Sequence, residues 1–538
     1  MTVLRVTAFT GTSPRTDPRL LNDNMAVSAI NTKLQTGTLK PYKGTTQVAT
    51  LSKPGVIQTL YRFGEEVTGD SQYWFHWTSD VDVVKGPLSD DPYERTYFTG
   101  DGAPKMTTNE IALTGGTNYP MAAYLLGLPS PGSAILPTVS GTGEGLAETR
   151  VYTYTYVSAL GEEGPPAGPS ITVDVQVGQS VLLSGMSTAP AGNYNVATKR
   201  IYRSVEGSTG AGYLFVAEIP VANTTYTDTV LAASLGESLP SLDWNAPPSD
   251  MSGLCLMANG IMAGFSKKDI CFSEPFVPSA WPISYRLQSD HPVVGLGAFG
   301  QSLFVGTEEF PYIISGVDPS LMTMTKLPQR QSCVSKRSIV DMGGGVFYAS
   351  PDGICLADST GVRVLTSELM TRDEWQSYNP SSISATQIDG RYFAFYDNGT
   401  KGCLIFDPTG NGAALWNSDL HYTAMYNDVS NDALYLANSG SVQKWDSGTN
   451  LTYTWKSKVF VLAQPENLGA AQVLANSYPV TFNVYADGAL VHTQSVANSG
   501  PFRLPSGFRA REWQLEMSGT AEVTAAFLST SIGELRAV

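Results

Sequence analysis

The clearest pattern along the chain is a recurrence of short apolar runs separated by polar turns. Five such runs, IMAGF, LFVGT, VFYAS, YFAFY and LYLAN, begin at Ile261, Leu303, Val346, Tyr392 and Leu434. Successive starts are 42, 43, 46 and 42 residues apart. Another apolar run precedes each one, and a third follows 8 to 11 residues later. Short apolar runs bounded by turn residues predict β-strands.

The spacing of these runs predicts a β-propeller. A period of about 40–45 residues with several strands per unit is typical of propeller blades, because a four-stranded sheet buries both faces only when neighbouring sheets stack on it. Asn259-Gly260 and Asp389-Gly390 stand between first and second strands, where tight hairpin turns favour such residues. Four earlier runs between residues 56 and 100, VIQTLYRF, QYWFHW, VDVVKG and RTYFTG, predict a sixth blade.

Two stretches depart from this period. Residues 129–245 open with a linker rich in Pro, Gly and Ser, and then place Tyr152, Tyr154 and Tyr156 on one face of a predicted strand. The following strands predict an immunoglobulin-like sandwich, and they resemble fibronectin type III modules, although the early tryptophan of that family is missing. Residues 456–538 alternate apolar and polar positions, which predicts a separate antiparallel sandwich.

We therefore expect an all-β fold: an irregular six-bladed β-propeller with an inserted immunoglobulin/fibronectin-III-like sandwich and a C-terminal β-sandwich. The expected parts are an N-terminal arm (1–49), a first propeller blade region (50–128), the inserted sandwich (129–245), the remaining propeller blades (246–455) and the C-terminal β-sandwich (456–538). The segment 20–35 fits either a short helix or a strand, and its periodicity does not separate them.

Composition narrows the class of protein. Hydrophobic residues make up 42% of the chain and charged residues 15%, which excludes a disordered chain. The five cysteines are odd in number and widely spaced, so we expect them to be small core hydrophobes. The sequence has no apolar run long enough for a membrane-spanning helix and no cleaved-signal pattern, which predicts folding in a cytoplasm.

Charge bears on nucleic-acid contact. The formal net charge is −15, which argues against wrapping around nucleic acid, but an acidic wall would let DNA slide past without sticking. Residues 1–43 differ from the rest, because they hold six basic residues and only two acidic ones, Asp17 and Asp23. A solvated basic surface explains this excess as well as a functional one does.

The sequence lacks the usual catalytic signatures. None of its four histidines stands in a metal-binding pattern, and it has neither a nucleophile elbow nor a phosphate-binding loop. We therefore expect no catalytic, cofactor or metal site, and no enzyme. The enzymatic alternative is a propeller-based glycoside hydrolase that uses Glu308 and Glu309, or Asp80 and Asp82, on host polysaccharide. A further alternative is a glycan-binding adhesin without catalysis.

The ends of the chain carry a family resemblance. The opening GTSPRTDPRLL and AVSAINTKLQTGTLKPYKG, the irregular blades, and the closing WKSKVF and FRLPSGFRAREWQLEMSG resemble the tail nozzle proteins, of tubular protein B type, of short-tailed bacteriophages and related virion proteins. The resemblance implies a hexameric ring in the virion tail, assembled in the host cytoplasm. It further implies head-tail adaptor or connector neighbours, tail fibres or spikes as partners, and transient passage of genomic DNA without sequence-specific binding.

Within such a ring, a few charged residues become candidates. Glu308 and Glu309 would form a carboxylate collar facing the channel, or they are simply solvated loop acids. Basic residues could dock partners, or they too are solvated; these are Arg15, Arg19, Arg503, Arg509 and Arg511.

Overall fold

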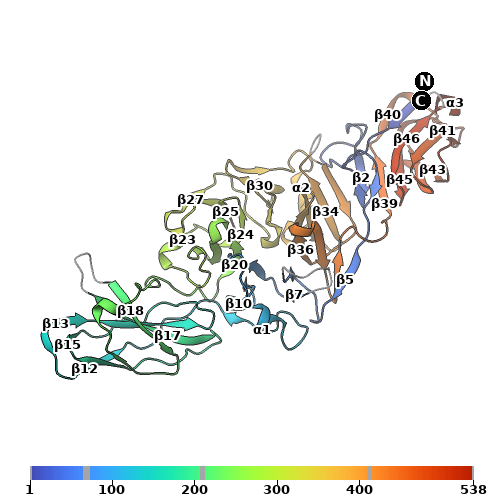
Figure 1. Ribbon diagram of the computed structural model, residues 1–538. Coiled ribbons are helices and arrows are strands. Elements are labelled where there is room, and N and C mark those ends of the chain that lie inside the picture. Colours follow the sequence, from blue (N-terminus) through green and yellow to red (C-terminus); the bar gives the residue numbers. More distant parts are fainter. Residues whose placement is uncertain (1–2, 65–72, 206–211, 410–413, 536–538) are drawn as a thin grey trace. The chain divides into compact units, whose positions relative to one another are not determined.

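The computed structural model describes residues 3–64, 73–205, 212–409 and 414–535. Within these residues the chain is nearly all β, with only short helices such as α1 (Asn109–Leu113), α2 (Arg372–Ser377) and α3 (Ile532–Leu535) (Figure 1). It divides into two compact units. Unit 1 comprises residues 1–78, 304–312 and 326–538, and unit 2 comprises residues 79–303 and 313–325.

In the described part of the chain, the predicted repeat is present as a series of four-stranded units, four of which are separate sheets, while the unit at residues 384–418 is part of a larger sheet. Each of the five predicted runs is the second strand of its own unit. The strands, in order within each sheet, are β20 (Ser252–Leu256), β21 (Met262–Ser266), β22 (Asp269–Phe272) and β23 (Leu287–Gln288); β24 (Val293–Phe299), β25 (Ser302–Thr307), β26 (Tyr312–Ser315) and β27 (Thr323–Lys326); β28 (Val340–Asp341), β29 (Val346–Ala349), β30 (Ile354–Asp358) and β31 (Gly361–Val364); β32 (Ser384–Ile388), β33 (Arg391–Asp397), β34 (Lys401–Asp407) and β35 (Ala414–Ser418); and β36 (Ala424–Asp428), β37 (Ala433–Ala437), β38 (Ser441–Lys444) and β5 (Thr46–Thr50).

The four runs between residues 56 and 100 do not form one sheet, so that part of the prediction is wrong. β6 (Thr59–Arg62) and β7 (Trp74–Trp77) pair with each other in unit 1. β8 (Asp82–Lys85) and β9 (Thr96–Thr99) instead join β10 (Lys105–Thr107) and β11 (Tyr124–Leu125) in unit 2. Trp74 packs against Tyr435, with ring centroids 4.8 Å apart, which ties β7 to β37. Apolar runs locate strands, but they do not reveal pairing partners.

The N-terminal residues are strands built into other sheets rather than a separate arm. β5 completes the sheet of β36, β37 and β38, with Thr50 opposite Ser441. β1 (Val3–Val6) pairs with β46 (Val523–Ser529), and β2 (Ala26–Ile30) lies between β35 and β39 (Tyr453–Ser457). The ambiguous segment 20–35 therefore contains strands, not a helix.

The C-terminal region is likewise not a separate sandwich. The sheet of β32 to β35 continues through β2 into β39, β45 (Ala510–Gly519), β42 (Val480–Ala486) and β43 (Ala489–Val496), with β40 (Phe460–Glu466) paired to β45. A second sheet has the order β1, β46, β41 (Ala470–Ala475) and β44 (Phe502–Arg503). The predicted alternation is confirmed, because Val480, Phe482 and Val484 are buried in a core that also holds Trp416. This continuous core joins the region to the preceding sheet.

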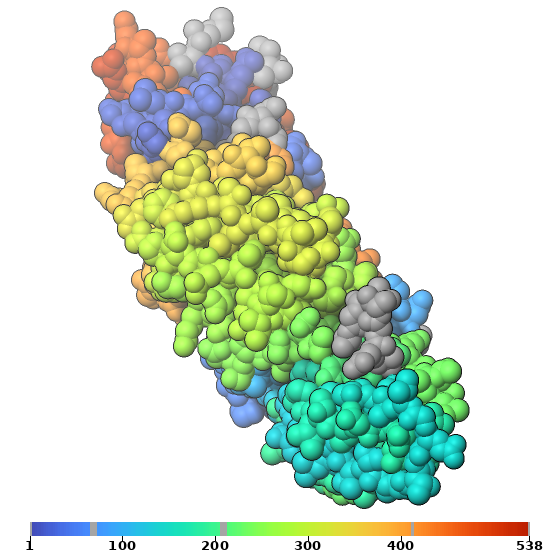
Figure 2. Space-filling view, turned by 90° about the vertical axis from the view of Figure 1, so that its left-hand side faces the viewer, coloured from blue at the N-terminus to red at the C-terminus, as the bar shows by residue number. Residues whose placement is uncertain are grey.

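Residues 129–245 lie in unit 2 and fold into three small sheets (Figures 1 and 2, cyan to green). Their strands are β12 (Leu136–Ser140), β16 (Ser180–Ser184) and β19 (Tyr226–Asp228); β13 (Glu144–Arg150) and β15 (Val173–Val177); and β14 (Tyr152–Ser158), β17 (Val196–Val205) and β18 (Gly212–Pro220). As predicted, Tyr152, Tyr154 and Tyr156 alternate along one strand, β14. All three are buried, and they share a core with Val181 and Ile201. We call residues 129–245 the inserted domain.

Among the described residues, no helix is both long enough and apolar enough to cross a membrane.

Candidate functional site

The predicted acidic pair sits in a tight turn directly after β25. The backbone N–H of Glu309 donates to the hydroxyl of Thr307 at 3.2 Å, and that hydroxyl donates to the carbonyl of Phe310 at 2.7 Å. Glu308 is exposed, whereas Glu309 is partly buried and forms a two-pronged ion pair with Arg330 at 2.7 and 2.8 Å. Arg330 offsets the charge of Glu309, whereas the carboxylate of Glu308 has no partner among the residues that the structure describes.

The second carboxylate pair considered for glycoside hydrolysis is also committed to local structure. One oxygen of Asp82 accepts the backbone N–H of Gly253 at 2.9 Å and the hydroxyl of Thr99 at 3.4 Å. These bonds link β8, β9 and β20 within unit 2. Each candidate carboxylate pair therefore has at least one member that is already engaged, Glu309 by Arg330 and Asp82 by Gly253 and Thr99.

The basic candidates separate into engaged and free residues. The guanidinium of Arg15 donates to the carbonyl of Ser367, and that of Arg511 donates to the carbonyl of Leu462 at 3.3 Å. Arg19 grips both oxygens of Asp17 at 2.9 Å, and these hydrogen bonds lower the pKa of Asp17 to about 2. Arg503 and Arg509 are exposed, and within the described part of the chain neither makes an ion pair.

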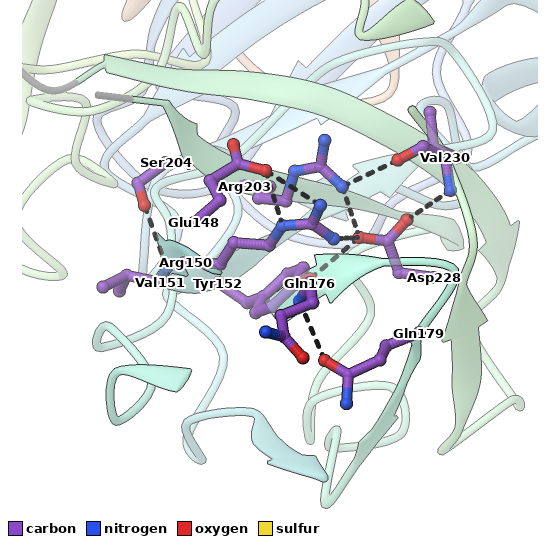
Figure 3. Close-up of polar contacts among 10 residues, drawn as sticks. All are labelled: Glu148, Arg150, Val151, Tyr152, Gln176, Gln179, Arg203, Ser204, Asp228 and Val230. Atoms are coloured by element: carbon purple, nitrogen blue, oxygen red, sulfur yellow. Dashed lines mark hydrogen bonds and ion pairs between the residues drawn. The ribbon is translucent and has the colours of Figure 1, made fainter. Parts of the chain in front are cut away.

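A buried charge cluster that the sequence did not predict lies inside the inserted domain (Figure 3). The carboxylate of Asp228 accepts hydrogen bonds from Arg203 and from the phenol of Tyr152, both at 2.8 Å, and Arg150 approaches it at 3.9 Å. Asp228 and Arg203 are both 0% exposed. Glu148 holds Arg150 at 2.9 Å from the other side.

This cluster fastens the inserted domain together rather than offering a reactive group. Its members come from β13, β14, β17 and β19, which belong to all three sheets of the domain. Burial and the neighbouring Asp228 raise the pKa of Tyr152 far above its ordinary value, so its proton stays in place at neutral pH. The sequence carried little sign of this cluster, because charged residues in strands usually face solvent.

A hollow in unit 1 is lined by three lysines, which belong to the basic excess of residues 1–43. It has a volume of about 270 Å³ and is lined by Lys33, Lys40, Pro41, Lys43, Asn450, Asn476, Ser477, Thr520, Ala521 and Glu522. Lys33 and Lys40 stand directly opposite each other on β3 (Thr32–Lys33) and β4 (Lys40–Pro41). We call this feature the lysine hollow. The basic excess of residues 1–43 was its only sequence signal.

The cysteines behave as expected from their spacing. All five are free thiols, and four of them are buried. Burial raises the pKa of Cys271 to about 11 and that of Cys255 to about 12, so both remain protonated at neutral pH. Across the described ranges, no three His, Cys, Asp or Glu side chains gather in a way that could hold a metal ion.

Comparison with known proteins does not assign a family. No protein-family model matches the chain, and no curated protein matches it. Solved structures align only loosely. The N-terminal domain of Nup159 is 11% identical, covers 59% of this chain and 86% of its own, and gives a TM-score of 0.24. PorZ, a surface component of the type-IX secretion system of Porphyromonas gingivalis, is 11% identical, covers 88% and 80%, and also gives 0.24. The extracellular domain of the one component system BT4673 from B. thetaiotaomicron is 11% identical, covers 95% and 82%, and gives 0.22. Similarity this low carries no argument about function.

Proposed function

We propose that this chain is a structural subunit of a bacteriophage tail nozzle, which assembles into a hexameric ring around the DNA exit channel. In this proposal the ring sits below the head-tail adaptor or connector, offers a platform for fibres or spikes, and lets genomic DNA pass without sequence-specific binding. The sequence resemblance at both ends of the chain is the starting point. The chain would reach the virion tail after folding in the host cytoplasm.

The observation that carries the proposal is the series of four-stranded units between residues 252 and 444, of which β32 to β35 continue into a larger sheet and the last is completed by β5 from the N-terminal region. We propose that these sheets stack radially as the blades of an irregular β-propeller, because such sheets need neighbours on both faces. The finer proposal of six blades includes the sheet of β8 to β11. Stiff sheets of this kind suit the wall of a tube, which must keep its shape while DNA moves through it.

We also propose that the inserted domain is an immunoglobulin-like decoration of the nozzle. Its three sheets share one core and its Asp228 cluster joins all three, so it has the internal cohesion of an independent module. An added β-module of this kind would serve as a contact point for fibres or spikes.

The proposed carboxylate collar around the channel consists of Glu308 without Glu309. Because Arg330 engages Glu309, of these two carboxylates only Glu308 would face the channel as an unpaired charge. One exposed carboxylate per subunit, repeated around a ring, would repel DNA phosphates from the wall. Arg503 and Arg509 remain as the residues whose charges are available for an acidic neighbour.

Electron microscopy tests the proposal on two preparations: the purified full-length protein at high concentration, and intact virions. We expect closed rings of identical subunits with a central channel. Monomers alone in both preparations would refute it.

The alternative functions are a glycan-binding adhesin and a glycoside hydrolase. The engagement of Glu309 by Arg330 and of Asp82 by Gly253 gives the hydrolase less support, because both named pairs lose a free carboxylate. Incubation with host capsular polysaccharide or lipopolysaccharide separates these functions. Cleavage that disappears in E308Q would establish the hydrolase, whereas a glycan-array signal without cleavage would favour the adhesin.

A further inference from the structure

The lysine hollow contains two lysines directly opposite each other on paired strands, an arrangement of like charges that sheets usually avoid. Lys33 and Lys40 form a directly opposed cross-strand pair, so their side chains share one face of the β3–β4 hairpin. Like charges in this arrangement destabilise a sheet unless counter-charges stand nearby. Lys43 lines the same hollow a few residues further on, so three lysines of an 11-residue segment contribute to its lining.

Two carboxylates balance two of these three charges. Lys33 pairs with one oxygen of Asp446, whose other oxygen accepts the backbone N–H of Lys43 at 2.7 Å. Lys40 pairs with Glu522 at 3.3 Å. The side chain of Lys43 is exposed and has no hydrogen-bond or ion-pair partner among the described residues. The hollow therefore keeps one positive charge in excess, although the whole chain carries −15.

The wall of the hollow is held in place by hydrogen bonds that do not involve the lysines. The backbone N–H of Asn476 donates to the carbonyl of Glu522 at 2.9 Å, and the backbone N–H of Glu522 donates to the side-chain oxygen of Asn476 at 3.0 Å. The amide of Asn450 donates to the carbonyl of Thr520 at 2.8 Å. The lysines thus face a preformed polar surface, and a ligand would meet little ordering cost on the wall side.

We propose that the lysine hollow is a binding site for an oxyanion, that is, a phosphate or carboxylate group. Lys43 supplies the unbalanced charge, and Lys40 can turn from Glu522 toward the ligand because a singly bonded ion pair at a partly exposed position is weak. Ammonium groups suit oxyanions as compact charges with several donors. This site is independent of the proposed nozzle function.

Calorimetric titration of the full-length protein tests the site. Inorganic phosphate and acetate are titrated separately at constant ionic strength set with sodium chloride, so that non-specific screening is the same throughout. Saturable binding of phosphate or of acetate is expected, and the one that binds identifies the chemistry of the ligand. Saturable binding of neither would overturn the proposal.

Variants locate the site. K43Q should weaken the binding by about tenfold, because one charge-assisted contact is lost. The matched control is K401Q, which removes an exposed lysine of unit 1 that is 3.7 Å from Asp397 and outside the hollow. It should leave the affinity unchanged. Equal affinity of K43Q and the unaltered protein would overturn the assignment.

A third variant tests the charge balance from the opposite side. E522Q removes the counter-charge of Lys40 while retaining the backbone bonds to Asn476, so it should bind the same anion several-fold more tightly. Unchanged or weaker binding by E522Q would contradict the proposed part of Lys40. None of these outcomes bears on ring formation, so failure here and failure of the nozzle proposal are distinguishable.

Discussion

Asp228 is the fully buried counter-charge of Arg203 in the inserted domain. D228N keeps the shape and one acceptor oxygen but leaves Arg203 as a buried charge without a counter-charge. Breaking such a pair destabilises a domain by about 3–5 kcal/mol. We expect D228N to lower the free energy of unfolding of the inserted domain by that amount, measured by hydrogen exchange of β14 and β17. The control D174N alters an exposed carboxylate bonded to Thr149 at 2.6 Å and should change stability by under about 1 kcal/mol. A similar loss in both variants would contradict the assigned role of the Asp228 cluster.

Lys199 gives the same domain a pH dependence. Its side chain is buried over Tyr154 and donates to the carbonyl of Asn223 at 2.7 Å, and burial lowers its pKa from 10.5 to about 8. The unfolded chain therefore binds more protons between pH 8 and 10.5, so Lys199 makes the free energy of unfolding rise with pH in that window. The total rise is at most about 3–4 kcal/mol, from the difference between the two pKa values.

The variant K199M isolates this effect. It should abolish the contribution of Lys199, so that the difference in stability between the unaltered protein and K199M changes steadily from pH 8 to pH 10. Buried tyrosines such as Tyr152 and Tyr202 have raised pKa values and act in the opposite direction near pH 10, but they are common to both proteins and cancel in the difference. The control K268M removes an exposed lysine that also donates to a carbonyl, that of Asp290, at 2.7 Å. If K268M and K199M gave the same pH profile, the assignment to Lys199 would be wrong.

At the scale of elements, the N-terminal strands complete sheets made by distant parts of the chain. β1 buries Val6 and pairs along β46, from Val3 opposite Ser529 to Val6 opposite Ala526. Deletion of residues 1–7 should therefore expose the edge of β46 and destabilise unit 1 by about 2–4 kcal/mol, from the burial of one valine and the lost backbone bonds. Hydrogen exchange of β46 and β41 should accelerate, while exchange in β14 and β17 of unit 2 should not change. Unaltered protection of β46 would show that β1 adds nothing to the sheet.

The elements also show what the sequence could and could not predict. Runs such as IMAGF and YFAFY located their strands, because a strand needs only local apolar character and turn residues at its ends. The pairing of β5 with β38 and of β2 with β39 was not predictable, since each joins residues about 400 positions apart in the chain. The same reason hides the lysine hollow and the Asp228 cluster. Their residues meet only after distant strands have paired, and no local spacing records that.

At the scale of the whole molecule, charge governs how the chain should meet DNA. With 48 acidic residues against 33 Lys and Arg, the protein cannot release the many phosphate counterions that drive tight binding to duplex DNA. We expect no retardation of linear duplex DNA by the full-length protein at about 0.15 M salt, in an electrophoretic mobility assay at micromolar concentrations.

The lysine hollow sharpens this expectation. After Asp446 and Glu522 pair with Lys33 and Lys40, only the charge of Lys43 is unbalanced, and one positive charge is too small to retain a polyanion against the repulsion of the remaining surface. E522Q, which raises the charge of the hollow by one, should therefore bind a small oxyanion more tightly and still not retain duplex DNA. A basic DNA-binding protein as positive control would establish that the assay detects retention. Salt-sensitive retention by the unaltered protein would mean that a local basic surface outweighs the net charge, and passage with low friction along this chain would no longer follow from its electrostatics.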